Sequence, residues 1–367
     1  MRDYYTREEW TGSLSSLKKR IESASDSPEF LYLDLGGVRK VRVVLFAKEA
    51  RDMIQRELKW VLTDAVDKPD ATIYLWQDSD MLSFARDFFV FPGTIEGNEY
   101  LLIKVQDGQE SFFPCGQLNI SARTIHLVEG DTYYIGADSF APERWISEGH
   151  ILVQMLFRIM NTAPSARLVH GACVGLDNKG LLLCARGQRG KSTLAVTAML
   201  KGLDYVSEDY LLLDKTDDGL YASPLYSIIS LSPFMYDKLY DGLDKARFVG
   251  VSHWKGKYVF DISEYTDGLK RHYPIRACLF PEICPDIAEP RIELCDPAEK
   301  NRAITQVAHS TLHQMWSRGI RQHQSDQSFI LDVIRMLKDL EFYKILLSPD
   351  IFKNAEYLKV FLQTLDN

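Results

Sequence analysis

Apolar and polar residues recur along the first part of the chain with the periods of both helices and strands. Helical spacing covers residues 6–24 and 49–65, and two strands are expected within 30–46 around the Gly36-Gly37 turn. No catalytic motif falls in this part, which therefore predicts an α+β domain. The other elements expected here are strands, at 71–76, 100–106 and 117–127.

The second part of the chain mixes short apolar runs, typical of buried strands, with amphipathic helical stretches. A helix is expected over 141–160, and the polar, proline-containing residues 161–165 end it. We place the domain boundary at the start of this helix, which gives an N-terminal domain over 1–140 and a second, α/β domain over 141–367. The later elements are expected to be strands at 168–172, 180–184, 205–214, 257–262, 277–280 and 341–347, and helices between Gly190 and Gly202, at 233–239, 297–308 and 329–340, and from 348 onward.

Composition and charge limit the classes of function. The chain has 367 residues, enough for two domains, and its 46% hydrophobic and 26% charged residues are ordinary for a globular protein. The net charge of −8 gives no basic surface for nucleic acid or an anionic membrane, and no apolar run approaches the roughly 18 residues of a membrane span. The six cysteines lack metal-site spacing and no signal-like segment opens the chain, so we expect reduced thiols in a cytoplasmic protein.

A glycine-rich turn between a strand pattern and a helical pattern has the sequence of a phosphate-binding loop. The usual form is G-x-x-x-x-G-K-[ST], whose backbone N–H groups surround phosphate oxygens at the start of a helix. Residues 185–192 read ARGQRGKS, with Ala185 in place of the first glycine. If the loop needs a left-handed conformation at Ala185, alanine costs about 1–2 kcal/mol there. We expect ATP to be bound by Arg186, Gly187, Gln188, Arg189, Gly190, Lys191, Ser192 and Thr193.

Two adjacent carboxylates follow the loop within the apolar strand expected at 205–214. Carboxylates are unfavourable in such a strand unless they are paired or bind a metal. Glu208 and Asp209 therefore predict a Mg²⁺ site beside the loop. In that site Lys191 would bind the β- and γ-phosphates of ATP, and Ser192 would ligate the metal together with one of the carboxylates.

A histidine in a third strand pattern completes a constellation that resembles a known family. His170 lies 21 residues before Lys191, and the two acids lie 17 and 18 residues after that lysine. This arrangement resembles the catalytic domain of HPr kinase/phosphorylase, and more closely the HPr-kinase-like proteins associated with peptide-modification gene clusters. The resemblance spans residues 164–300 and is sharpest over 168–214. It implies a P-loop fold of the HPr kinase and phosphoenolpyruvate carboxykinase type.

The resemblance also implies roles for single residues. His170 matches the histidine that assists at the acceptor hydroxyl, Glu208 the acid proposed as base at the acceptor serine, and Asp209 the acid on the metal side. Ala185 and Gln188 replace glycines of the family loop, and Glu208 replaces an aspartate. The predicted catalytic residues are thus His170, Lys191, Glu208 and Asp209, and the predicted metal ligands are Ser192 and Asp209.

Basic residues beyond these motifs are candidates for a further phosphate contact. Kinases neutralise the charge on the phosphoryl group that they transfer, and most use more than one cation to do so. Arg276, directly before an apolar strand pattern, is our first choice for binding ATP. The full set of candidates is Lys255, Lys257, Arg271 and Arg276.

Together these motifs predict an ATP- and Mg²⁺-dependent kinase that transfers the γ-phosphate to a hydroxyl, with a serine of a small protein or peptide as the expected acceptor. The N-terminal domain would bind this acceptor or mediate assembly into a homo-oligomer. Two alternatives stay open: a kinase of a small metabolite, and a nucleotide-binding regulatory module without turnover. The sequence does not identify the acceptor.

Overall fold

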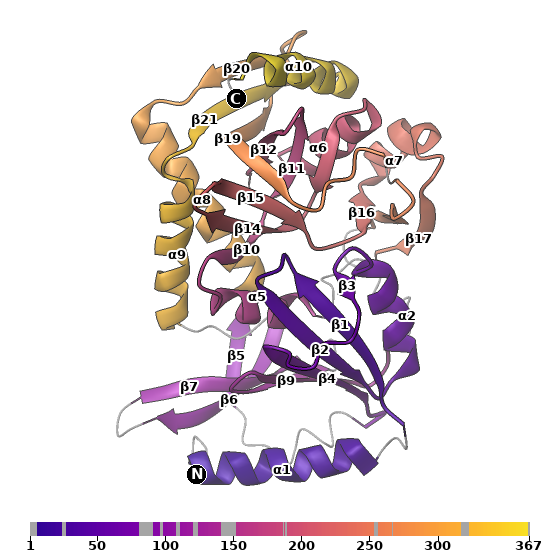
Figure 1. Cartoon of the computed structure of the whole chain (residues 1–367), viewed down its shortest axis with the longest axis vertical. Coiled ribbons are helices and arrows are strands. Elements are labelled where there is room, and N and C mark those ends of the chain that lie inside the picture. The colour runs from indigo at the N-terminus through magenta and orange to yellow at the C-terminus, as the bar shows by residue number, and fades with distance from the viewer. Residues whose placement is uncertain are drawn as a thin grey trace. The chain divides into compact units, whose positions relative to one another are not determined.

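The chain divides into two compact units in the computed structural model, and each unit has its own sheet (Figure 1). The first unit comprises residues 1–55, 62–144 and 315–326, and the second comprises 56–61, 145–314 and 327–367. The structure describes residues 6–23, 27–80, 91–95, 98–107, 111–119, 124–140, 152–185, 187, 189–252, 256–265, 267–316 and 323–365.

A nine-stranded sheet forms the body of the first unit. Its elements are α1 (Arg7–Ser23), β1 (Glu29–Leu35), β2 (Arg39–Leu45), α2 (Lys48–Glu57), β3 (Leu62–Thr63), β4 (Ala71–Gln77), β5 (Phe91–Ile95), β6 (Asn98–Asp107), β7 (Ser111–Asn119), β8 (Thr124–Glu129) and β9 (Thr132–Ala137). The strand order is β3-β1-β2-β4-β9-β8-β7-β6-β5. The predicted hairpin is confirmed: Gly36 and Gly37 join β1 to β2 with φ of 66° and 76°, values that favour glycine.

The two helices of the first unit follow the predicted apolar stripes, with one difference in length. α1 buries Trp10, Leu14, Leu17 and Ile21 at helical spacing. The second stripe predicts a helix over 49–65, but α2 ends at Glu57 and the chain then turns. The physical reason is tertiary packing, because the residues after Glu57 contribute to the core of the second unit.

The second unit is a mixed α/β arrangement around another nine-stranded sheet, with a separate three-stranded sheet. Its elements are α5 (Val153–Asn161), β10 (Ala166–His170), β11 (Ala172–Leu176), β12 (Lys179–Leu183), α6 (Lys191–Leu200), β13 (Asp204–Ser207), β14 (Tyr210–Thr216), β15 (Gly219–Pro224), β16 (Ile228–Leu231), α7 (Pro233–Leu239), the 3₁₀ turn η1 (Tyr240–Gly242), β17 (Arg247–Val251), β18 (Tyr258–Asp261), β19 (Tyr273–Ile283), β20 (Arg291–Leu294), α8 (Pro297–Trp316), α9 (His323–Leu337), β21 (Glu341–Leu347) and α10 (Ile351–Thr364). The large sheet has the order β10-β14-β15-β19-β12-β11-β13, with β21 beside β19, and the small sheet has the order β16-β18-β17.

Strand β12 lies inside the large sheet and is buried on both faces. It runs parallel to β19 and antiparallel to β11. Leu181 and Leu183 belong to the core that includes apolar residues of α6 and α10. Leu182 points to the opposite face, in register with Cys173 and Cys278. Burial of both faces explains why this strand reads as a continuous apolar run in the sequence.

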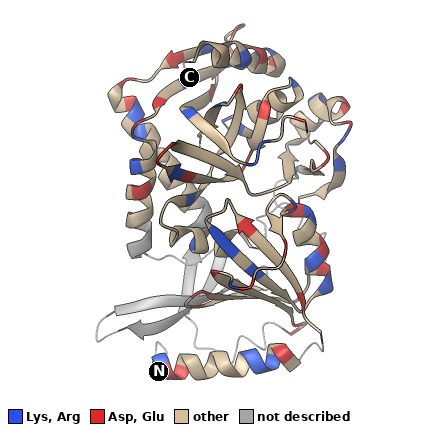
Figure 2. Ribbon diagram, in the orientation of Figure 1, with Lys and Arg blue, Asp and Glu red and all other residues tan. Residues whose placement is uncertain are grey.

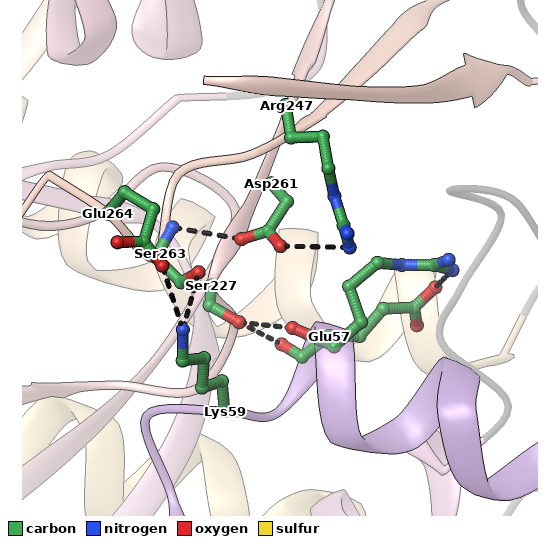
Figure 3. Close-up of polar contacts among 8 residues, drawn as sticks. Glu57, Lys59, Ser227, Arg247, Asp261, Ser263 and Glu264 are labelled. Atoms are coloured by element: carbon green, nitrogen blue, oxygen red, sulfur yellow. Dashed lines mark hydrogen bonds and ion pairs between the residues drawn. The ribbon is translucent and has the colours of Figure 1, made fainter. Parts of the chain in front are cut away.

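Residues 56–61, from the N-terminal half of the chain, are joined to the rest of the second unit by hydrogen bonds of backbone and side chains (Figure 3). Ser227, just before β16, donates its backbone N–H to Glu57 O at 2.8 Å and its hydroxyl to Arg56 O at 2.6 Å. Lys59 Nζ donates to Ser263 Oγ at 3.0 Å, after the end of β18. The segment is therefore fixed next to the start of β16 and the end of β18, two neighbouring strands of the small sheet.

Trp60 anchors the same segment in the hydrophobic core. It is 6% exposed and belongs to the core cluster of the second unit. Its ring meets that of Tyr205 in β13 edge to face, with the centroids 6.4 Å apart. A residue more than 100 positions upstream thus packs directly behind the strand that leads to the acidic pair.

Several helices of the second unit differ from the predicted ranges. The helix predicted over 141–160 is described only from α5 onward, and residues 141–151 lie outside the described residues. α8 continues past the predicted end at 308, because buried residues such as Thr311 and Leu312 extend its apolar face. α10 begins at Ile351 rather than at 348, since Asp350 caps it by accepting from the N–H groups of Phe352 and Lys353.

Charged residues of both signs are interspersed along the helices, whereas most strand positions are uncharged (Figure 2). α1 and α10 carry acidic and basic residues along their lengths. Among the described helices, none is both long and apolar enough to span a lipid bilayer.

Candidate active site

The predicted phosphate-binding loop connects the carboxyl end of β12 to the amino end of α6. Cys184 extends the pairing of β12 by donating its N–H to Leu279 O of β19 at 3.0 Å, and the chain then leaves the sheet. β12, β19 and β21 run parallel, so their carboxyl ends meet at this edge. Ligands of open α/β sheets bind outside the carboxyl ends of the strands. The loop therefore lies where a nucleotide site is expected.

Gly190 is the loop residue whose backbone requires glycine. Its φ is +89°, in the left-handed region, and it directly precedes Lys191, the first residue of α6. A Cβ at this position would also come within 2.7 Å of Leu347 Cδ1. Any other residue here would therefore meet both backbone strain and a close contact.

The first testable prediction concerns this glycine. Gly190→Ala is expected to destabilise the second unit by about 1–3 kcal/mol and to weaken ATP binding, because the loop and the first turn of α6 must shift. Gly187→Ala is the matched control, since a Cβ at Gly187 meets nothing within 4 Å. Urea unfolding and ATP titration measure both effects. Identical behaviour of the two variants would contradict the requirement for glycine at position 190.

Ala185 occupies the position of the first glycine of the usual loop without backbone strain. It is buried, with 5% of its surface exposed. The described non-glycine residues with positive φ are Asp177 and Asn178, so Ala185 is not left-handed and the cost considered for alanine does not arise. Of the other loop residues, Gly187 and Arg189 are exposed, and Arg186 and Gln188 lie outside the described residues.

Lys191 joins the start of α6 to the acidic pair. The residue is 5% exposed, and its Nζ donates a hydrogen bond to the backbone oxygen of Glu208 at 2.9 Å. Ser192 and Thr193 follow it in the first turn of the helix, both partly buried. A buried ammonium group is stable only where acceptors or anions surround it. Lys191 therefore marks a position at which negative charge is favourable.

The acidic pair lies in a bend between two strands. The apolar run predicts one strand over 205–214, but the structure has β13, a bend at Glu208-Asp209, and then β14. β13 pairs with β11 and β14 pairs with β10, so the chain changes its strand partner at the bend. Ser207 Oγ closes the bend by donating to Tyr210 O at 2.6 Å. Adjacent residues of a continuous strand would point to opposite faces, and the bend removes that constraint from the two carboxylates.

His170, at the end of β10, contacts Asp209. The two atoms concerned, His170 Nε2 and Asp209 Oδ1, are 3.1 Å apart. The backbone also holds the two together, since Gly171 N–H donates to Asp209 O at 2.9 Å and His170 N–H donates to Thr311 Oγ1 at 3.0 Å. Desolvation acts to raise the pKa of Asp209, but the opposing effect of three basic side chains is larger and holds that pKa well below its usual value: His170, Lys191 and Lys257. Asp209 is therefore an ionised carboxylate paired with an imidazole.

Glu208 differs from Asp209 in both exposure and partner. Glu208 is 4% exposed, whereas the side chain of Asp209 is 41% exposed. Glu208 Oε1 accepts a hydrogen bond from the backbone N–H of Ser230 in β16 at 3.0 Å. Glu208 Oε2 is buried and receives no hydrogen bond within the described part of the chain. A buried carboxylate oxygen of this kind is unfavourable unless a cation or a ligand donor reaches it.

These residues fit a Mg²⁺ ion that arrives with a nucleotide. Mg²⁺ in nucleotide sites binds one or two protein oxygens and takes its other ligands from water and phosphate. The described residues contain no group of three or more His, Cys, Asp and Glu side chains that could hold a metal ion alone. Hard oxygen donors come from two places, Ser192 Oγ in the first turn of α6 and the Glu208 and Asp209 carboxylates in the bend after β13. The donor set suits a shared site with phosphate oxygens, and not a metal held by the protein alone.

The structure does not bring Arg276 together with the loop. In the pairing of β12 with β19, Gly180 is opposite Ile275 and Leu181 is opposite Ala277, so Arg276 is level with the start of β12. The loop begins only after Leu183, roughly 10 Å further along the strand at 3.3 Å per residue. The Arg276 residue is also exposed. A role of Arg276 in binding ATP stays a prediction, and the strand register gives it no support.

Sequence reasoning missed the residues that hold the site in place. Ser207 closes the acidic bend, Ser230 binds Glu208 through its backbone, and Thr311 accepts from the backbone of His170. Ser207 could have been noticed because a short polar side chain before a carboxylate pair favours a bend. Ser230 and Thr311 gave no signal, since one acts through its backbone and the other lies 141 residues from its partner.

Comparisons with known proteins give no family assignment. No family model matches the chain, and no curated protein matches it in sequence. Among solved structures it is similar to the structure of the Hpr(Ser) kinase/phosphatase from Coxiella burnetii, with a TM-score of 0.28 and 10% sequence identity. That match covers 54% of this chain and 97% of the other chain. A TM-score this low establishes neither a shared fold nor family membership.

Proposed function

We propose that this chain is an ATP-dependent kinase that transfers the γ-phosphate of ATP to a hydroxyl group, and that the acceptor is a serine of a small protein or peptide. The observation that carries the proposal is the convergence of four side chains at the end of one loop. Phosphoryl transfer requires a phosphate-binding element, cations to neutralise charge, and a base near the acceptor hydroxyl. The loop supplies the first of these, and the other two come from His170, Lys191, Glu208 and Asp209.

The start of α6 would bind the phosphates. Its first N–H groups have no partners within the helix and favour anions, and Lys191 adds a full positive charge at the same place. Mg²⁺ arriving with ATP would supply further positive charge, and Ser192 would be one of its ligands. The protein groups thus orient the nucleotide and stabilise negative charge without forming a covalent bond to it.

The geometry favours Asp209 as the base and Glu208 as the residue on the metal side, which exchanges the roles implied by the family resemblance. Asp209 is the more exposed carboxylate and contacts His170, so it can accept the proton of an approaching hydroxyl while the imidazole holds its orientation. Glu208 is enclosed beside Lys191 and has the buried oxygen that a cation would stabilise. The two carboxylates would then perform different tasks because their surroundings differ.

The second prediction separates the two carboxylates. Asp209→Asn is expected to lower the rate of phosphoryl transfer by about 10²–10⁴-fold, the usual contribution of a general base, while ATP affinity stays within about twofold. Glu208→Gln is expected instead to weaken the Mg²⁺ dependence of ATP binding, because it removes the charge of the buried oxygen. Both substitutions keep the size and shape of the side chain. If Asp209→Asn weakens the Mg²⁺-dependent binding of ATP and Glu208→Gln does not, then Asp209 is on the metal side and Glu208 is the base, as the family resemblance implies.

The proposed activity is tested by incubating the full chain with ATP, Mg²⁺ and candidate acceptors, and measuring ADP formation. Serine-bearing products of neighbouring genes are the first candidates. We expect ADP to form in proportion to the acceptor added. ADP formation only with a small metabolite would instead identify the metabolite kinase, and tight ATP binding without any turnover would identify the regulatory module.

A further inference from the structure

Lys257 lies on the small sheet, at the position where this sheet approaches the acidic pair. It directly precedes β18, in which Tyr258 is opposite Leu231 and Val259 is opposite Ser230 of β16. Ser230 is the residue whose backbone N–H binds Glu208 Oε1. Ser230 thus contacts the acidic pair directly, and Lys257 lies on the neighbouring strand, two residues before the position opposite Ser230.

The turn before β18 fixes the backbone of Lys257. Ser252 N–H donates to Lys257 O at 2.8 Å, and Gly256 N–H donates to Ser252 O at 2.9 Å. Gly256 has a φ of +58°, which a residue with a side chain would adopt only with strain. The hydrogen bond from Ser252 thus fixes the backbone of Lys257 at the start of β18.

The ammonium group of Lys257 has no fixed partner in the described part of the chain. Lys257 is only partly exposed, and its ammonium group makes no ion pair or hydrogen bond with any residue that the structure describes. His170 and Lys191, by contrast, both contact the acidic pair directly. Lys257 is therefore a cation near the acidic pair, by the register of β18 with β16, and it has capacity for an anionic ligand.

We propose that Lys257 binds the terminal phosphate group of ATP, in addition to Lys191. This inference rests on the proposed kinase function. Lys191 comes from the start of α6 and Lys257 from the edge of β18, so the transferred phosphoryl group would contact cations from two different elements. Such an arrangement stabilises the charge on the phosphoryl oxygens during transfer. It also gives the protein a means of distinguishing ATP from ADP, because ADP lacks the group that Lys257 would bind.

The test compares two nucleotides and does not depend on the acceptor. The dissociation constants of a non-hydrolysable ATP analogue and of ADP are measured in Mg²⁺ for the wild-type chain, Lys257→Ala and Lys257→Arg. We expect Lys257→Ala to raise the dissociation constant of the ATP analogue about tenfold or more, and that of ADP less than about twofold. A change of this size is expected when one charge-assisted hydrogen bond is lost. Lys257→Arg, which retains the charge, should restore most of the preference for the ATP analogue.

Lys201→Ala is the matched control for loss of one positive charge. Lys201 follows α6 at its carboxyl end, about 15 Å from the loop at 1.5 Å per residue, and its Nζ pairs with Glu356 at 2.8 Å. It should leave both dissociation constants unchanged. If Lys257→Ala weakens both nucleotides equally or neither of them, the assignment of Lys257 is wrong while the kinase proposal stands. If the wild-type chain binds neither nucleotide, both proposals are wrong.

Discussion

Lys191→Ala is expected to reduce phosphoryl transfer from ATP by about 10³-fold or more. Lys191 is the cation at the start of α6, and its Nζ contacts the acidic bend directly. Removing the Lys191 side chain would take away the positive charge at the start of α6 that would bind the phosphates. It would also leave the backbone carbonyl of Glu208 without the hydrogen bond that the ammonium group donates to it. Rates of ADP formation in the presence of acceptor measure the effect.

Two comparisons make the result specific to Lys191. Lys201→Ala removes a positive charge from the other end of α6 and should keep the wild-type rate. Thermal unfolding of Lys191→Ala shows whether the variant remains folded, because a buried ammonium group is being removed. A folded Lys191→Ala variant that retains most of the wild-type rate would exclude the loop as the site of transfer.

Trp60→Ala is expected to lower the free energy of unfolding of the second unit by about 3–5 kcal/mol, the usual range for removing a buried aromatic side chain. Trp60 is 6% exposed and packs on Tyr205, three residues before the acidic pair. Loss of the ring would leave a cavity beneath β13. Hydrogen exchange, followed separately in β13 and in the strands of the first unit, measures the effect and shows which unit it concerns.

The control for this prediction is the neighbouring Lys59→Ala. Lys59 pairs with Glu264 at 3.2 Å, but the two side chains are 50% and 73% exposed, so the ion pair should contribute less than about 1 kcal/mol. We expect protection in β13 to fall sharply in Trp60→Ala and to change little in Lys59→Ala. Equal, small changes in both would mean that the 56–61 segment is only loosely attached to the second unit.

The local elements around the site could be predicted from the sequence because their signals are local. The strand β12, the glycine-rich loop and the helix α6 follow one another within about 20 residues, and each has its own pattern of apolar or glycine residues. The end of α6 is an example: Gly202 has a φ of +79°, as expected for a glycine that ends a helix.

The rest of the site depends on contacts between distant residues, which a periodic pattern does not encode. The apolar run over 205–214 predicts one strand, because the bend at the acidic pair arises from a change of strand partner and not from a glycine or proline. The helix predicted over 49–65 is shortened for a similar reason, since Trp60 belongs to the core of the second unit. The place of Arg276 next to a strand predicts a phosphate contact, but only the register of β19 with β12 shows that its backbone is level with the start of β12.

The most direct measurement of the central claim follows the label from two forms of ATP. The full chain is incubated with Mg²⁺ and a serine-bearing acceptor, once with ATP labelled in the γ-phosphate and once with ATP labelled in the α-phosphate. We predict that label from the γ-phosphate appears on a serine of the acceptor, that label from the α-phosphate does not, and that Asp209→Asn nearly abolishes the signal. Bound ATP with no transfer of either label, or transfer of the α-label, would contradict the account.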